Sequence, residues 1–174
     1  MENENPQETP VTVRSIGIRF GLYGALVRIL LFAIAAVLGL NAFNGPISWV
    51  GAVIGIAIMV FGHIQYKKEG TGYMQYSQGV GIGFWMGLIG TVIVVPIMYI
   101  YLTFIDSSPF DLFLRMQEDE MIAKGVPDQA IEMGISWTKK LFWVSAIFGG
   151  IIGSVILALI VSIFTKKSSP EMPV

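Results

Sequence analysis

Residues 141–164 read LFWVSAIFGGIIGSVILALIVSIF, a run that contains no charged side chain. A helix needs about 20 apolar residues to cross a hydrocarbon core of roughly 30 Å, so this run is long enough to span a membrane. Because backbone amides in lipid must be hydrogen-bonded internally, we expect the run to be a helix. The segment therefore predicts an integral membrane protein rather than a soluble domain.

Three further apolar runs of similar length precede it, at about 18–40, 47–66 and 80–105. Of the 174 residues, 54% are hydrophobic and only 13% are charged, whereas a soluble domain usually carries about 25% charged residues. The predicted fold class is all-α, a polytopic membrane protein built as a four-transmembrane-helix bundle. The chain has no cysteine, which excludes disulfides and thiolate chemistry within it.

Basic residues predict how this bundle is oriented. They flank the first, second and fourth runs, as Arg14, Arg19, Lys67, Lys68, Lys166 and Lys167. With four crossings all of them lie on one side, which the positive-inside rule places in the cytoplasm. We therefore predict a cytoplasmic tail at 1–17, a transmembrane domain at 18–165 with its fourth helix at about 141–164, and a second cytoplasmic tail at 166–174.

The segment at about 107–140 is predicted to lie on the opposite side. Helix-forming residues run from Asp111 to Lys124, Gly125 ends them, and Pro127 begins a second helical stretch. This pattern predicts a short amphipathic helical hairpin near the membrane surface, between the third and fourth spans. Its water-facing acids are the candidate outer partner surface: Glu118, Asp119 and Glu120. They lack the ligand spacing of a calcium loop, so no metal site is predicted.

Small residues recur at every fourth position in the third and fourth runs, which is typical of helices that approach each other closely. The predicted packing faces are Gly79, Gly83 and Gly87 on one helix, and Ser145, Gly149 and Gly153 on the other. Packing within the bundle is the first interpretation, and an oligomer or partner interface is the second. Pro96 removes one backbone donor from the third run and predicts a kink or hinge there.

Arg28 is a charged residue deep inside the first run, where insertion costs about 2.5 kcal/mol or more. No acid lies inside any run, so its counter-charge would be Glu69, Glu171, a lipid phosphate or another subunit. Snorkelling to the headgroups is the first interpretation, and a ligand or lipid-headgroup site is the second. His63 is interpreted as an interfacial residue that could share a shallow cytoplasmic pocket with Arg28 and Gln78.

Three motifs give the chain a family resemblance. They are Gly72-Tyr-Met-Gln-Tyr-Ser-Gln78, Met116-Gln-Glu-Asp-Glu-Met121 and Gly125-Val-Pro-Asp-Gln-Ala-Ile-Glu-Met133. In this order, over nearly the whole chain, the sequence resembles the DUF4199 family of small membrane proteins from Bacteroidota. The resemblance implies a location in a bacterial inner membrane. It implies no catalytic residue, because the function of that family is unknown.

The function predicted from these features is a non-enzymatic membrane scaffold or accessory subunit. No P-loop, nucleophile elbow, zinc-protease motif or dinucleotide fingerprint is present in the sequence, and no cofactor is expected. Expected partners are membrane lipids and either a second copy or another membrane protein; the net charge of −1 argues against nucleic acid. The alternative is an oligomeric lipid-handling protein or small transporter that holds an anionic headgroup near Arg28.

Overall fold

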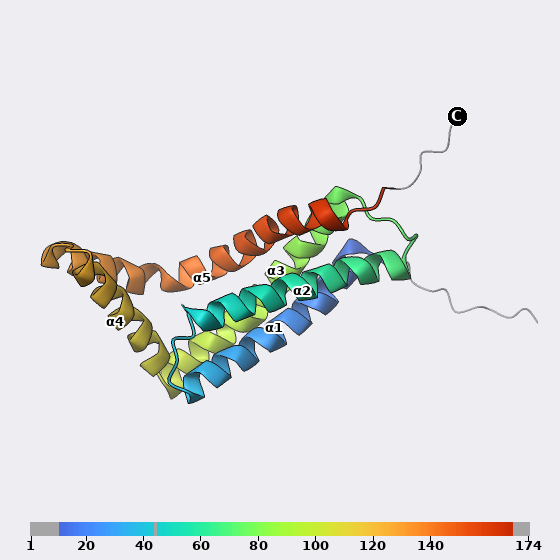
Figure 1. Cartoon of the computed structure of the whole chain (residues 1–174). Helices are drawn as coiled ribbons and strands as arrows, with labels where there is room; N and C mark the ends of the chain where they lie inside the picture. Colours follow the sequence, from blue (N-terminus) through green and yellow to red (C-terminus); the bar gives the residue numbers. More distant parts are fainter. Residues whose placement is uncertain (1–10, 44, 169–174) are drawn as a thin grey trace, which may run out of the picture.

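The computed structural model describes residues 11–43 and 45–168, and every element of regular structure in these ranges is a helix (Figure 1). In chain order they are α1 (Val13–Val37), α2 (Pro46–Glu69), α3 (Tyr76–Ile100), the π-helical turn η1 (Tyr101–Ile105), α4 (Ser108–Ala123) and α5 (Asp128–Thr165). Within the described ranges, four helices are long and apolar enough to cross a membrane: α1, α2, α3 together with η1, and α5. The predicted all-α class with four spans is confirmed.

The first helix begins inside the segment predicted as an N-terminal tail, because its end is capped. The Thr12 hydroxyl accepts a hydrogen bond from the Ser15 amide at 3.0 Å, and the Ser15 hydroxyl accepts one from the Thr12 amide at 3.1 Å. This reciprocal capping box satisfies two amide groups at the start of the helix. Helix α1 therefore starts at Val13 rather than near residue 18.

Helix α5 is longer than predicted. The sequence predicts a hairpin arm from Pro127 and a separate span from about residue 141, but the structure has one helix of 38 residues from Asp128 to Thr165. Neither glycine nor proline interrupts residues 135–148, so nothing there breaks the helix. At 1.5 Å per residue it is about 57 Å long. The hairpin of α4 and the start of α5 therefore extends beyond the end of α2 (Figure 1), instead of folding flat across the bundle.

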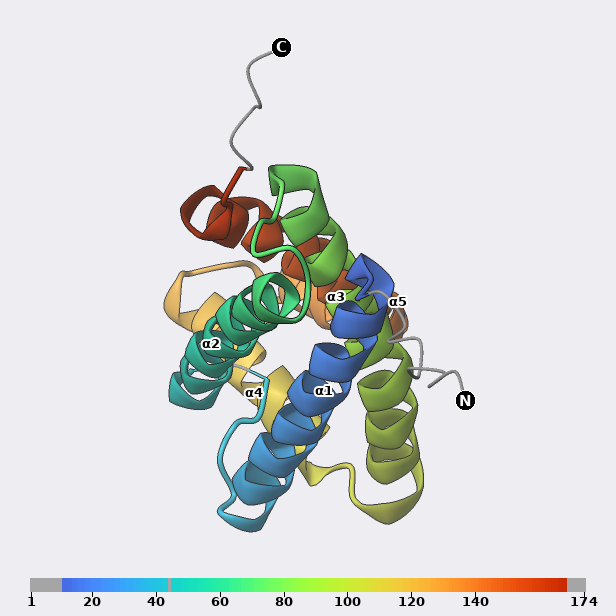
Figure 2. The same cartoon turned by 90° about the vertical axis from the view of Figure 1, so that its right-hand side faces the viewer.

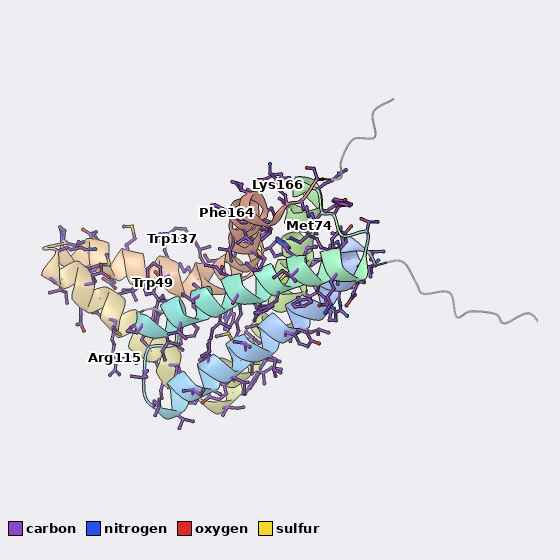
Figure 3. The ribbon with its side chains drawn as sticks, turned by 45° about the vertical axis from the view of Figure 1, so that its right-hand side comes forward. Trp49, Met74, Arg115, Trp137, Phe164 and Lys166 are labelled. Carbon is purple, nitrogen blue, oxygen red and sulfur yellow. The ribbon has the colours of Figure 1, made fainter. Side chains whose placement is uncertain are left out.

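The bundle has two distinct ends. At one end, which we call the terminal end, α1 and α3 begin at Val13 and Tyr76, and α2 and α5 finish at Glu69 and Thr165. At the opposite end, the hairpin end, α4 projects from the spans. Figure 3 shows Lys166 at the terminal end and Arg115 on α4 at the hairpin end. The helices therefore alternate in direction, as consecutive membrane crossings require.

Helix α3 lies between α1 and α5 and packs extensively against both, whereas α2 makes sparser contacts with its neighbours (Figure 2). On the α1 side, Gly17 lies against Trp85 and Ile82, and Gly21 lies against Met86 and Ile89. A Cβ at either glycine would press on these atoms, so the missing side chains allow the two helices to approach closely. Helices α1, α3 and α5 therefore form a tight layer, and α2 lies on one side of it.

The contact between α3 and α5 is also built from small residues. The residues on the two antiparallel helices meet in pairs at four-residue spacing: Gly79 with Ser162, Gly83 with Ala158, Gly87 with Ser154, and Thr91 with Gly150. The predicted face of α3 is therefore the one that packs. The predicted face of α5 is not, because no described atom lies within 4 Å of a Cβ built at Gly149 or Gly153. The contacting stripe is displaced by one residue, about 100° around the helix.

This displaced register predicts opposite effects for two similar substitutions. In Gly83→Ala the new methyl group overlaps the Ala158 side chain, and we expect a loss of about 1–3 kcal/mol in the free energy of unfolding. In Gly153→Ala the new methyl group enters open space, and better helix propensity is expected to keep or raise stability by up to about 1 kcal/mol. Thermal unfolding in detergent, followed by circular dichroism, compares the two. Equal destabilisation by both would contradict the register.

Candidate intramembrane binding site

A cavity of about 510 Å³ lies between α1, α2, α3 and α5, in the membrane-spanning part of the bundle. Its wall consists mainly of glycines and apolar side chains. Among the lining residues, the polar and charged side chains are Arg28, Ser48 and Ser154. The volume falls within the range of roughly 300–1,000 Å³ that is usual for small-molecule sites. The space is therefore large enough to hold a ligand.

The cavity arises because α2 packs closely only near the terminal end. The buried residues of α2 are Met59, Gly62 and His63, and the described part of its first half, residues 46–57, contains none. On the opposite wall, Gly149 and Gly153 have no side chains to fill the gap. The cavity occupies the space that this sparse packing leaves.

Arg28 is the charged residue of this cavity. A Cβ built at Gly90 of α3 would lie 3.4 Å from a guanidinium nitrogen of Arg28, so the side chain reaches the surface of α3. Arg28 is exposed and also lines the cavity. Within residues 11–43 and 45–168, its guanidinium makes no ion pair and no hydrogen bond. A charge without a partner at this depth is costly.

Neither acidic residue suggested by the sequence neutralises Arg28 within the described part of the chain. Glu69 lies at the terminal end and instead pairs with Arg19, whose guanidinium donates to its two carboxylate oxygens at 2.7 and 2.9 Å. Glu171 lies outside the described residues. The remaining suggestions are a lipid phosphate and a group from another molecule.

His63 is fully buried at the terminal end, where it joins three helices. Its Nε2 lies 3.1 Å from the Gly79 carbonyl and its Nδ1 lies 2.7 Å from the Thr165 hydroxyl. Because a carbonyl only accepts, Nε2 carries a proton and donates to Gly79. Lys67 also donates to the Thr165 carbonyl at 2.8 Å. These hydrogen bonds hold α2, α3 and α5 together.

The predicted pocket shared by Arg28, His63 and Gln78 is wrong. His63 bonds to Gly79, whereas Arg28 lies beside Gly90, and eleven residues of helix separate these glycines by about 16 Å. The Gln78 side chain accepts a hydrogen bond from the backbone amide of Gln75 at 2.7 Å and caps the start of α3. His63 and Gln78 therefore stabilise the terminal end, and Arg28 alone of the three lines the cavity.

An aromatic cluster lies at the hairpin end. It joins α1, the α1–α2 turn, η1, α4 and α5 through Phe32, Phe43, Tyr101, Phe110, Phe113 and Phe142. Pro96 is not in the cavity wall but in a separate apolar groove with Tyr99 and Trp143. Helix α3 continues through Pro96 to Ile100 before the π-helical turn. The hinge at Pro96 stays a prediction.

The acidic residues of the hairpin are exposed, as the sequence indicated. Glu120 accepts a hydrogen bond from Lys124 at 2.6 Å, which lowers the pKa of the Glu120 carboxyl. Glu118 lies at a groove between α4 and α5, together with Asp128 and Glu132. Among the described residues, no group of three or more histidine, cysteine, aspartate or glutamate side chains could hold a metal ion. These carboxylates form a solvated surface.

Two parts of this site had no usable signal in the sequence. Ser48 and Gly90 are an ordinary helix-start serine and one glycine among many, and only the packing of four helices brings them to one cavity. Gly149 and Gly153 did carry a signal, their four-residue spacing, but that spacing was interpreted as a contact face. The structure places both in the cavity wall.

A family model described as a protein of unknown function, DUF4199, matches residues 19–167. No curated protein and no solved structure matches the sequence or the fold. The matched range contains Arg28 and reaches from the first turns of α1 past the end of α5. Because this match covers most of the chain, the chain belongs to the DUF4199 family.

Proposed function

We propose that this protein binds an amphiphilic ligand in its intramembrane cavity and holds the anionic headgroup of that ligand with Arg28. The observation that carries the proposal is a guanidinium without a protein partner in the described chain, facing a cavity of about 510 Å³. An anionic ligand would supply the missing counter-charge. Of the two functions that the sequence suggests, this proposal favours the lipid-handling protein over the membrane scaffold.

The energetics of a charge inside a membrane-spanning helix support this choice. Insertion of an arginine near the bilayer centre costs about 2.5–3.5 kcal/mol, and hydrogen bonds between ions recover about 1.5–3 kcal/mol each. Arginine can bind carboxylate or phosphate through two parallel hydrogen bonds, which also fixes the orientation of the headgroup. Binding an anion would therefore offset most of the cost of keeping Arg28 in the membrane.

The lining supports a binding function rather than catalysis. In the described part of the chain, Arg28, Ser48 and Ser154 line the cavity together with glycines and apolar groups, and Ser154 already donates to the Gly83 carbonyl at 2.8 Å. No described aspartate, glutamate or histidine lines the cavity to act as a general base beside these hydroxyls. We therefore propose a carrier or receptor for an amphiphile, not an enzyme.

A second candidate function is an accessory subunit, for which the hairpin is the supporting observation. The α4–α5 hairpin extends beyond the spans (Figure 1) and carries exposed acids beside exposed apolar side chains such as Ile122. Such a surface suits a second membrane protein or a second copy of this chain. This role is compatible with ligand binding, because the hairpin groove and the cavity have no lining residue in common.

We also propose that the terminal end faces the cytoplasm of a bacterial inner membrane. Arg14, Arg19, Lys67 and Lys68 all belong to helix ends there, and Lys166 follows α5 at the same end. Such a concentration of basic residues is typical of the cytoplasmic side. The hairpin then lies on the opposite face of the membrane.

Substitution of Arg28 tests the binding proposal. In lipid nanodiscs that contain hexadecanoate and phosphatidylglycerol, we expect Arg28→Gln to retain at least about tenfold less anionic ligand than the wild type, since the lost ionic hydrogen bonds are worth roughly 1.5–3 kcal/mol. Native mass spectrometry measures the retained ligand. Arg28→Lys should keep part of the binding because it keeps the charge.

Arg115→Gln is the matched control for this experiment. It removes the same charge from an exposed position on α4, far from the cavity, and should leave ligand retention unchanged. The proposal fails if wild type, Arg28→Gln and Arg115→Gln retain the same ligands in the same amounts.

Charge removal on the hairpin tests the accessory role. If a stoichiometric membrane protein co-purifies with the wild type, we expect the triple variant Glu118→Gln, Asp119→Asn and Glu120→Gln to lose it, because these side chains are exposed on α4. The same variant should retain anionic ligand normally. Co-purification that survives the triple substitution would argue against this surface.

Single cysteines test the orientation, because the chain has no cysteine of its own. Asp119→Cys lies on the hairpin and Thr71→Cys lies in the turn between α2 and α3, and both positions are exposed. In intact cells with a permeabilised outer membrane, an impermeant maleimide should label Asp119→Cys only. Thr71→Cys should react only after the inner membrane is broken, and the reverse pattern would invert the topology.

A further inference from the structure

We propose that the intramembrane cavity opens and closes, and that in the closed state the first half of α2 packs against α5 through two facing glycine stripes. One stripe is Gly51 and Gly55 on α2, and the other is Gly149 and Gly153 on α5; all four glycines line the cavity. The structure described above is the open state. A ligand on Arg28 holds this state, so the inference rests on the proposed function and adds the regulation of the same site.

The two glycine stripes lie at the same depth in the bundle. Helices α2 and α5 both run from the hairpin end to the terminal end, so they are parallel. At the terminal end, His63 Nδ1 lies 2.7 Å from the hydroxyl of Thr165, which is 102 positions further along the chain. Because both helices rise by about 1.5 Å per residue, the same offset puts Gly51 level with Gly153. The stripes therefore oppose each other across the cavity.

Neither stripe is covered in the open state. No described atom lies within 4 Å of a Cβ built at Gly55, Gly149 or Gly153, and a Cβ at Gly51 meets only a methyl carbon of Leu31 at 3.6 Å. Helices in lipid are held together mainly by close packing of such small residues, and an open space forfeits the dispersion contacts of both its walls. Contact between the two stripes would recover these contacts.

The contacts of α2 place a pivot at the terminal end. The buried residues of this helix, Met59, Gly62 and His63, all lie in the half toward that end. Lys67 adds a hydrogen bond to the Thr165 carbonyl at 2.8 Å. The half of α2 that carries Gly51 and Gly55 has no comparable attachment among the described residues, so it can approach α5 while the terminal end stays fixed.

The other end of α2 follows a turn that can accommodate this movement. Phe43 is held in the aromatic cluster by Phe113 and Phe142. Gly45, with a φ of 82°, separates Phe43 from Pro46, where α2 begins. Since glycine adopts a wide range of backbone conformations, the turn can follow α2 while Phe43 stays in place.

Closure and ligand binding exclude each other, because the space of about 510 Å³ that a ligand would occupy is the space that closure removes. A ligand that binds only the open state shifts the population toward that state. Conversely, the apparent affinity for the ligand falls in proportion to the fraction of open protein. The contact between the glycine stripes therefore competes with the ligand and sets how tightly it is held.

Distances between spin labels test the movement, since the chain has no cysteine of its own. The variant Val50→Cys and Ile152→Cys carries nitroxide labels on the moving half of α2 and on α5, and Phe61→Cys and Ile163→Cys carries them near the pivot. All four side chains are exposed. Double electron–electron resonance in phosphatidylcholine nanodiscs should give two distances for the first pair, because removal of a gap as wide as one water molecule shortens the separation by about 3 Å or more.

Addition of hexadecanoate and phosphatidylglycerol should leave only the longer distance of the first pair. The control pair should keep one distance throughout. A single distance for the first pair that the two lipids leave unchanged would overturn the closure. Two distances whose proportions stay constant while anionic ligand is retained would overturn its coupling to the ligand.

A reversible crosslink provides the second arm of the test. Gly51→Cys with Gly153→Cys should form a disulfide under mild oxidation, since a disulfide needs Cα atoms within about 7 Å and contact between the stripes brings them that close. By native mass spectrometry, the oxidised protein should retain at least about tenfold less hexadecanoate or phosphatidylglycerol than the same protein after reduction, because the trapped population cannot open. Gly51→Cys alone is the control and should retain equal amounts under both conditions.

Recovery of binding on reduction also shows that the double variant is folded. Failure to form the disulfide, or equal ligand retention before and after its reduction, would overturn the inference.

Arg28→Gln separates this inference from the proposed function. Retention of anionic ligand that depends on Arg28, together with a single unchanged label distance, would overturn the closure and leave the proposed function standing. Two label distances together with equal ligand retention in wild type and Arg28→Gln would overturn the proposed function, while the closure of α2 would stand.

Discussion

The close approach of α3 to its two neighbours is the constraint on which the rest of this structure depends. In lipid, helices gain little from hydrophobic burial against each other, so tight van der Waals packing has to hold them together. Gly83 and Gly87 of α3 let Ala158 and Ser154 of α5 lie close to the α3 backbone. Gly17 and Gly21 of α1 likewise let side chains of α3 lie close to the α1 backbone. With three helices fixed in one layer, α2 has no fourth groove of comparable depth to occupy. It rests on the layer at the terminal end and stands away from it elsewhere, and the cavity follows from that geometry.

The two ends of the bundle consequently have different stabilities. At the terminal end the buried imidazole of His63 links two helices to α2, Lys67 bonds to the last turn of α5, and Met74 pairs with Lys167 through two backbone hydrogen bonds of 2.9 Å. The hairpin end is held mainly by edge-to-face aromatic contacts such as that between Phe32 and Tyr101. Aromatic pairs are worth about 0.5–1.5 kcal/mol beyond their burial and allow rotation. Local opening of this bundle should therefore begin at the hairpin end.

Arg28 connects this architecture to function. A charge of this kind inside a membrane protein is usually matched by an acid or by backbone carbonyls, and here the described residues supply neither. The glycines around Arg28 have no side chains, so they offer it no polar group and leave open space. A ligand that brings both a negative charge and a hydrocarbon chain would complete the electrostatics and the packing at once, which a free anion or a neutral lipid would not.

Hydropathy and charge in the sequence alone determined the four spans, the hairpin after the third span and the isolation of Arg28, because these properties depend on residues that are near one another in the chain. Side-chain spacing also identified the packing face of α3. It could not choose between the two small-residue stripes of α5, since Gly149 and Gly150 differ by only one position, or about 100° of rotation, and both stripes read alike. The depth of His63 relative to Arg28 was equally undecided, because it depends on how far α1 slides along α3. Only the tertiary structure settled these points, through steric contacts such as Thr91 against Gly150 that exist only once the helices have packed.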